Sequence, residues 1–120
     1  MAAGSHDFEC EQGSTFKQTI TYADSTNTAI NLTDHKARMQ VRYARSGEAD
    51  LVVQLNETNG RATITNATAG EITLLIDSTT TTTFVAGNYH YDLEIYTADN
   101  PPTVERILEG RFLVDPEVTV

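Results

Sequence analysis

VAGNYHYDLEIYTADNPPTVERILEGRFLVDPEVTV, residues 85–120, is the stretch that decides the fold of this chain. In its first half, apolar residues recur at every second position, which is the period of a strand with one buried face. These residues are Tyr89, Tyr91, Leu93 and Ile95, and they alternate with His90, Asp92, Glu94 and Tyr96. A turn at residues 97–102 contains two prolines, which disfavour a helix, and a second strand pattern follows at residues 104–114. The stretch therefore predicts two neighbouring antiparallel strands.

Gly110 lies inside the second strand pattern. A glycine at such a position marks a bulge or a close approach of another backbone. The apolar phase shifts between Leu108 and Leu113, so we expect a bulge at Gly110. This bulge would twist the last strand and direct residues 116–120 away from the domain, toward a partner.

Shorter strand patterns precede this pair. They cover residues 16–22, 29–34, 36–43, 51–55, 61–65 and 71–77. The clearest alternation places Ala37, Met39, Val41 and Tyr43 on one side and Lys36, Arg38, Gln40 and Arg42 on the other. The dipeptide Asn59-Gly60 indicates a hairpin between two of these strands. The threonines at residues 79–83 have two interpretations: more strand, or a loop or single helical turn that closes one end of the sandwich.

No part of the sequence has the apolar period of a long helix. Seven or eight short strands separated by turn residues are typical of an all-β protein, and a single antiparallel β-sandwich is favoured over a small barrel. A chain of 120 residues is the size of one domain. We therefore expect one sandwich domain at residues 7–120, preceded by a flexible arm at residues 1–6, whose sequence is small and polar.

Composition excludes several classes of function. The net charge of −9, from 17 acidic and 8 basic residues, disfavours nucleic acid as a partner. The single cysteine, Cys10, rules out an intrachain disulfide and is expected to be a small, half-buried side chain. The sequence contains no apolar run long enough for a membrane span and no secretion signal, so we expect a chain made in the cytoplasm without a membrane partner.

The sequence offers little that resembles a catalytic or metal site. His90, Asp92 and Glu94 form a row on one strand, about 7 Å apart, and would need a second strand to complete a metal shell, so a solvated polar face is the favoured interpretation. There is no GxSxG motif, no glycine-rich phosphate loop and no basic residue near Cys10. We expect no enzymatic activity, no metal, no cofactor and no small-molecule substrate. Tyr96 is the one aromatic residue expected to be exposed, which leaves a carbohydrate-binding module as an alternative.

The order of residues resembles that of small virion proteins of tailed bacteriophages. The resemblance includes FECEQGSTFKQTITYADSTNTAINLTDHKARMQVR at residues 8–42, NG at 59–60, AGEITL at 69–74, AGNYHYDLEI at 86–95, LEGRF at 108–112 and DPEVT at 115–119. Family members often begin with an acidic segment containing EQG, continue with a strand containing Thr and then Trp or Tyr, and follow with a segment such as NLTGYxARMQIR. This chain has Tyr22 where the family usually has a tryptophan. The resemblance extends over residues 7–119.

This resemblance implies an immunoglobulin-like β-sandwich similar to the N-terminal domain of phage baseplate upper proteins. The implied function is a non-enzymatic part of the virion that joins tail, baseplate or fibre proteins, in several copies within a symmetric assembly. A capsid decoration or neck protein is the alternative within the virion. Exposed sheet edges are expected to pair with other chains by strand addition. The individual residues expected to bind partners are Met1, Ala2, Ala3, Tyr96, Pro116, Glu117, Val118, Thr119 and Val120.

Overall fold

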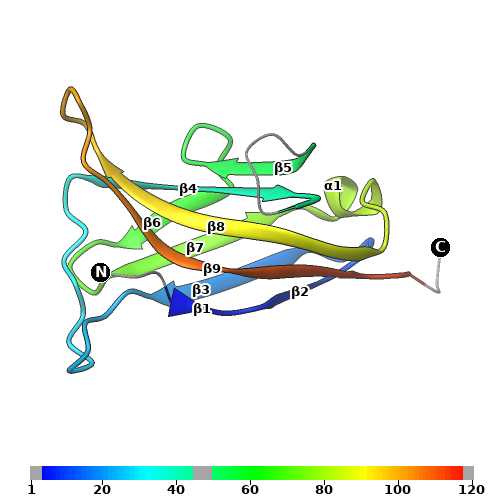
Figure 1. The fold of residues 1–120 in the computed structure, drawn as a ribbon, viewed down its shortest axis with the longest axis horizontal. Helices are drawn as coiled ribbons and strands as arrows, with labels where there is room; N and C mark the ends of the chain where they lie inside the picture. Colours follow the sequence, from blue (N-terminus) through cyan, green and yellow to red (C-terminus); the bar gives the residue numbers. More distant parts are fainter. Residues whose placement is uncertain (1–3, 45–49, 118–120) are drawn as a thin grey trace.

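A computed structural model of the chain describes residues 4–44 and 50–117. Two β-sheets pack against each other, and one short helix lies at an end of the sandwich (Figure 1). Along the chain the elements are β1 (Gly4–Ser5), β2 (Phe8–Glu11), β3 (Phe16–Thr21), β4 (His35–Arg42), β5 (Leu51–Asn56), β6 (Ala62–Asn66), β7 (Glu71–Ile76), α1 (Ser78–Thr82), β8 (Gly87–Thr97) and β9 (Val104–Asp115). The prediction of an all-β sandwich with little helix is confirmed. The strand count is higher than expected because the first residues of the chain add two short strands.

The strand order is that of an immunoglobulin-type sandwich. One sheet has the order β9-β8-β4-β5, with β1 and β2 both paired to β9, and the other has the order β3-β7-β6. In immunoglobulin-type domains, strands B, E and D share one sheet, while C, F and G share the other, joined by C′ in the variable type. Strands β3 to β9 follow this distribution in chain order. The Tyr89 hydroxyl also donates a hydrogen bond to the carbonyl of Val85, four residues upstream, as in the tyrosine corner of this fold.

The prediction of a purely antiparallel sandwich is wrong for the first strands. β1 and β2 run parallel to β9, with Gly4 opposite Leu108 and Phe8 opposite Phe112. His6 lies between β1 and β2 in the chain, and its N–H donates to the Glu109 carbonyl of β9 at 2.9 Å. Residues 4–6, which we expected to belong to a flexible arm, are therefore bonded to the last strand, and residues 1–3 lie outside the described residues.

Gly110 is not the site of a bulge. The β8–β9 ladder continues through it, with Tyr91 opposite Gly110, and the register shifts elsewhere, between Leu93 and Glu94, where β9 accommodates Ile107. An added Cβ on Gly110 would lie 2.0 Å from the backbone oxygen of His6. The glycine is therefore required for a close backbone approach, the other interpretation that its position in a strand allowed.

The turn at Asn59-Gly60 does not form a hairpin. β5 pairs with β4 and β6 pairs with β7, so this turn takes the chain from one sheet to the other. The Asn59 side chain accepts hydrogen bonds from the N–H groups of Asn56 and Arg61, and Gly60 has a φ of 74°. These local features explain why Asn59-Gly60 forms a turn, but they do not determine which strands pair. The predicted extended piece at residues 29–34 likewise forms no strand and contains only an isolated bridge from Ala29 to Ala23.

The threonine run forms the helical turn that was one of its two interpretations. The Asp77 side chain caps α1 by accepting a hydrogen bond from the Thr80 N–H at 3.0 Å. Thr81 is fully buried, and its hydroxyl donates to the Ser14 carbonyl at 2.8 Å. This helical turn therefore closes the end of the sandwich next to the β2–β3 turn.

The core consists of the alternate residues that the sequence pattern predicted. Tyr89, Tyr91, Leu93 and Ile95 of β8 are buried, as are Ala37, Met39 and Val41 of β4. Tyr43, which was expected on the same side as Met39 and Val41, is 53% exposed instead, and Leu51 is 43% exposed. Tyr43 follows the end of β4, and Leu51 is the first residue of β5, so the two sheets no longer cover them.

Replacing Gly110 with alanine should destabilise the protein by about 2–3 kcal/mol, because the new methyl group would overlap the His6 backbone oxygen. Denaturant unfolding of the two proteins measures this difference. Gly4→Ala is the matched control on the same pair of segments, since its Cβ would meet Leu108 at an ordinary 3.5 Å. Equal stabilities for the two variants would contradict the close approach at Gly110.

Candidate protein-interaction surfaces

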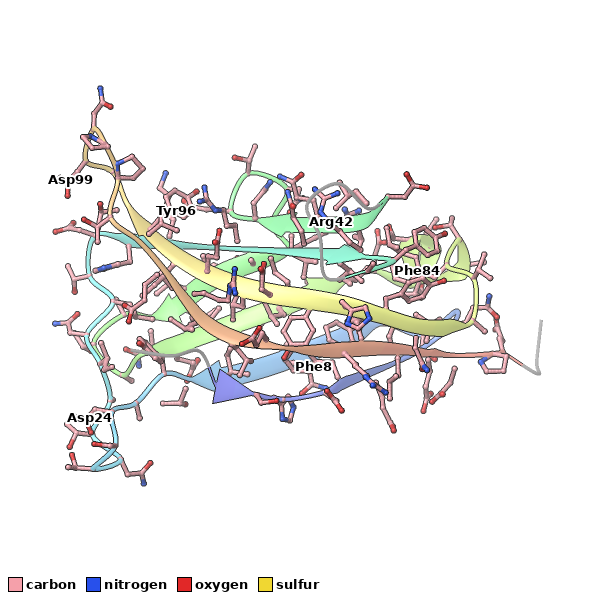
Figure 2. All side chains as sticks on the ribbon, viewed as in Figure 1. Phe8, Asp24, Arg42, Phe84, Tyr96 and Asp99 are labelled. Carbon is pink, nitrogen blue, oxygen red and sulfur yellow. The ribbon has the colours of Figure 1, made fainter. Side chains whose placement is uncertain are left out.

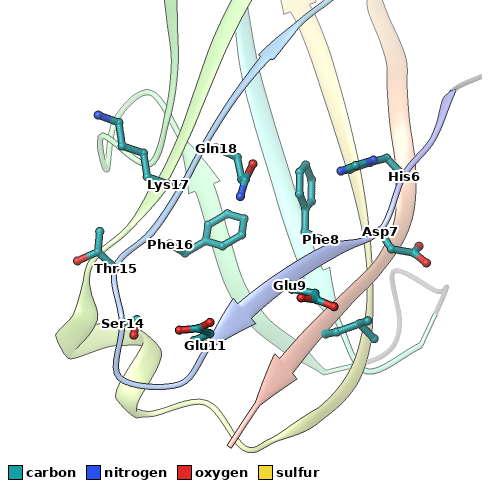
Figure 3. Close-up of a pocket in the computed structure, with 11 residues that line it drawn as sticks. His6, Asp7, Phe8, Glu9, Glu11, Ser14, Thr15, Phe16, Lys17 and Gln18 are labelled. Atoms are coloured by element: carbon teal, nitrogen blue, oxygen red, sulfur yellow. The ribbon is translucent and has the colours of Figure 1, made fainter. Parts of the chain in front are cut away.

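The open side of the sandwich lies between β2 and β3. A shallow depression of about 600 Å³, which we call the β2–β3 groove, runs along it. Figure 3 shows Phe8, Phe16 and Gln18 in the space between the two strands, with Glu9 and Glu11 on β2 and Lys17 on β3. Among residues 4–44 and 50–117, β2 pairs only with β9 and β3 only with β7, so each strand is the edge of its sheet.

Half of the backbone groups of β3 point away from its sheet. The Tyr22 N–H donates to the Gly70 carbonyl at 2.8 Å, and the antiparallel register continues back along β3 from this bond. Because alternate residues of an edge strand bond to its neighbour, the amides and carbonyls of Lys17, Thr19 and Thr21 are directed to the open side. The Thr19 and Thr73 hydroxyl oxygens are 3.3 Å apart, as expected for a pair whose backbones do not bond to each other.

Along β2, backbone groups also alternate between those that face β9 and those that face the open side, but the side chains differ from those of β3. The N–H groups of His6 and Gln12 donate to Glu109 and Asp115 of β9, each at 2.9 Å. The backbone groups of the intervening odd residues therefore point away from β9, although the Glu11 carbonyl accepts the Ser14 N–H at 3.0 Å. Along this edge the odd positions are all acidic.

The floor of the groove is aromatic and its rim is charged. Phe8 and Phe16 are 2% and 4% exposed, and their ring centroids are 5.8 Å apart in an edge-to-face arrangement. Glu9, Glu11 and Lys17 are exposed around them. The groove can therefore bind an extended segment through backbone hydrogen bonds and attract positive charge, but it offers no deep pocket for a small molecule.

The outer face of β4, β8 and β9 is a network of paired charges. His90, Asp92 and Glu94 lie opposite Arg42, Gln40 and Arg38 of β4. The Arg38 Nε lies 2.9 Å from the Glu94 Oε1, and Arg106 lies 3.4 Å from Asp92. Burial raises the pKa of the Asp92 carboxyl, and the positive charge of Arg106 offsets part of that rise. Within residues 4–44 and 50–117, no group of three or more His, Cys, Asp or Glu side chains is arranged to bind a metal.

Tyr96 belongs to the same face and is half-buried rather than freely exposed. The Arg38 guanidinium carbon lies 4.6 Å from the centre of its ring. Figure 2 shows Tyr96 near the end of the sandwich that contains the Asp99 turn, far from Phe84 at the other end. One face of the ring is therefore already occupied by a cation, which leaves less of it for a sugar or a partner.

The described part of the C-terminal tail, Pro116 and Glu117, stays in contact with the domain at the β2–β3 turn. The Glu117 N–H donates to the Gln12 Oε1 at 2.9 Å, and the Gln12 Nε2 donates to the Phe84 carbonyl at 2.7 Å. Pro116 is exposed, whereas Glu117 is half-buried against Gly13. The other expected terminal contacts, Met1, Ala2, Ala3, Val118, Thr119 and Val120, lie outside the described residues.

Gln12 is a structural residue that the sequence interpretation did not single out. Its amide joins the β2–β3 turn, the start of the tail and the loop after α1. The available signal was the segment Glu11-Gln12-Gly13, quoted above only as part of a resemblance. Gly13 has a φ of 83°, which explains why a glycine follows the glutamine in this turn.

No protein-family model matches this sequence, and no curated protein matches it. Among the helices in the described part of the chain, none is long and apolar enough to cross a membrane. A functional proposal for this chain therefore depends on the sequence resemblance, the fold and the geometry of the groove.

Cys10 is 1% exposed and should make stability depend on pH in the alkaline range. Burial raises the pKa of its thiol from 9.0 to about 11, with the carboxylates of Asp115 and Glu11 adding to the shift. Because the folded state holds the proton more tightly, this contribution is complete below pH 9 and is lost as the pH rises from 9 to 11. The free energy of unfolding of the wild type, relative to Cys10→Ala, should fall by about 2 kcal/mol between pH 8 and pH 10.5. Parallel stability curves for the two proteins would contradict the raised pKa, since the tyrosines titrate in both.

Proposed function

We propose that the protein is a non-enzymatic structural component of a tailed-phage virion that joins tail, baseplate or fibre proteins through protein–protein contacts. The observation that supports this proposal best is the β2–β3 groove, where two edge strands direct alternate backbone groups to one open side. Exposed edges of this kind are positions at which another chain can add a strand. The sequence resemblance over residues 7–119 supplies the class of partner, namely other virion proteins.

The fold agrees with this proposal. The immunoglobulin-type sandwich is the architecture that the resemblance implies, and α1 closes one of its ends (Figure 1). The groove between β2 and β3 and the charged outer face of β4, β8 and β9 remain for contacts. Contacts of both kinds suit a building block that touches several neighbours.

The carbohydrate-binding alternative has less support. Such modules commonly stack sugars on exposed aromatic faces, and the one aromatic residue proposed for that role, Tyr96, has Arg38 over its ring. The two aromatic rings in the groove wall, Phe8 and Phe16, are buried, so neither presents an open face for a sugar to stack on. A glycan array probed with the wild type and with Tyr96→Ala separates the two functions: glycan binding that is lost in the variant would favour the carbohydrate-binding module.

Electron microscopy of phage particles decorated with gold-labelled antibody against this chain tests the virion proposal. We expect label at the tail end of the particle, because the proposed partners are tail, baseplate or fibre proteins. Label on the capsid faces or at the neck would favour the decoration or neck alternative. Particles without label, under conditions in which the antibody binds the purified chain, would contradict a virion function.

A further inference from the structure

We infer that the free edge of β3 is a docking site for a basic, extended segment of another protein, which adds to the β3-β7-β6 sheet as a fourth strand. This inference rests on the proposed function for the identity of the partner as a virion protein. The physical basis of the docking site does not depend on which protein binds there. It comes from the backbone of β3, from the three-stranded sheet that contains β3 and from the charges around the β2–β3 groove.

The backbone of β3 is suited to accept a strand. Lys17, Thr19 and Thr21 direct their amides and carbonyls to the open side, as the bond from Tyr22 to Gly70 requires. β3 has six residues in one unbroken register with β7 and contains no proline. Natural edge strands are usually protected by proline, bulges or dense charge, and of these β3 has only Lys17.

The other described edges are less suited. β6, on the far side of the same sheet, has a register shift between Ile64 and Asn66. The ladder between β5 and β4 has a register shift between Val41 and Arg42. β2 is only four residues long, and two of its residues are acidic. β3 is therefore the edge at which an added strand would find the longest regular ladder.

The course of the first segment explains why this edge is open. In immunoglobulin-type sandwiches, the sheet that contains strands B, E and D commonly has a fourth strand, A, beside B. Here β3 occupies the place of strand B, but the first segment pairs with β9 in the opposite sheet. A strand supplied by another chain would complete the four-stranded sheet.

The charge around the groove selects a basic occupant. Asp7, Glu9 and Glu11 line it, against a single lysine, Lys17. A second copy of this chain is disfavoured, because each copy has a net charge of −9. An added strand would place alternate side chains toward Phe8 and Phe16, so the fitting segment has apolar residues at alternate positions and lysine or arginine among the others.

Fluorescence anisotropy with a labelled synthetic peptide tests this inference. The probe is the acetylated and amidated peptide Lys-Val-Thr-Val-Lys-Val-Thr-Val-Lys, and the protein is the full chain. Thr19→Pro removes one outward N–H without removing a donor to β7, whereas Thr19→Val, the matched control, keeps that N–H and loses the same hydroxyl. We expect saturable binding to the wild type and to Thr19→Val, and binding at least about tenfold weaker to Thr19→Pro.

Two further comparisons separate the backbone and charge contributions. A probe with N-methyl groups at every internal residue has no internal N–H to donate from either edge and cannot form the edge ladder, so it should bind at least about tenfold more weakly to the wild type even if Thr19→Pro fails to fold. A Glu9→Gln, Glu11→Gln double variant should bind the unmodified probe more weakly and with less dependence on salt.

Absence of saturable binding to the wild type would overturn the inference, and so would equal binding of the N-methylated and unmodified probes. The peptide assay does not depend on particles. If the peptide binds but virions carry no label, the proposed function is contradicted and the docking site on β3 is supported. If virions carry label but the peptide does not bind, the docking site is contradicted and the proposed function is supported.

Discussion

The parallel pairing of the first segment with the last strand determines which edge of the sandwich stays open. β1 and β2 keep one register along β9, and between them His6 bonds to Glu109. Three features allow this pairing: the missing side chain of Gly110, the Tyr91 hydroxyl that donates to the His6 carbonyl, and the Asp7 carboxylate that accepts the Arg111 N–H at 2.9 Å. Because the first segment is committed to this sheet, the edge of the opposite sheet stays open.

The contacts around Gln12 hold the first segment in place at the end of the sandwich near α1. Gln12 joins the turn after β2 to the tail and to the loop after α1, while Thr81 anchors α1 to Ser14. β2 and β3 are thus held together at their shared turn, with Phe8 and Phe16 packed between them. The result is a preformed groove with two strand edges, which can bind an extended segment without first rearranging the sandwich.

The period of the sequence predicted most strands and their buried faces, because side-chain alternation is a local property of each strand. It could not predict the pairing of residues 4–5 and 8–11 with β9, since these segments are only two and four residues long and their partner is about a hundred positions away in the chain. The same limit explains Gly110 and Asn59-Gly60. At Gly110 the expected bulge is absent, and the glycine is needed instead for the approach of His6 from the distant first segment. At Asn59-Gly60 the turn was predicted correctly, but not which strands pair on either side of it. For the candidate site, the sequence directed attention to Tyr96 and the termini, whereas the groove arises only where β2 and β3 diverge into different sheets.

Amide hydrogen exchange followed by NMR determines whether β3 is an open edge in the free protein. The alternation of the ladder predicts slow exchange at Gln18, Ile20 and Tyr22, whose N–H groups face β7, and fast exchange at Lys17, Thr19 and Thr21. Slow exchange at all six positions in a monomeric sample would show that the edge is already covered and would contradict the account.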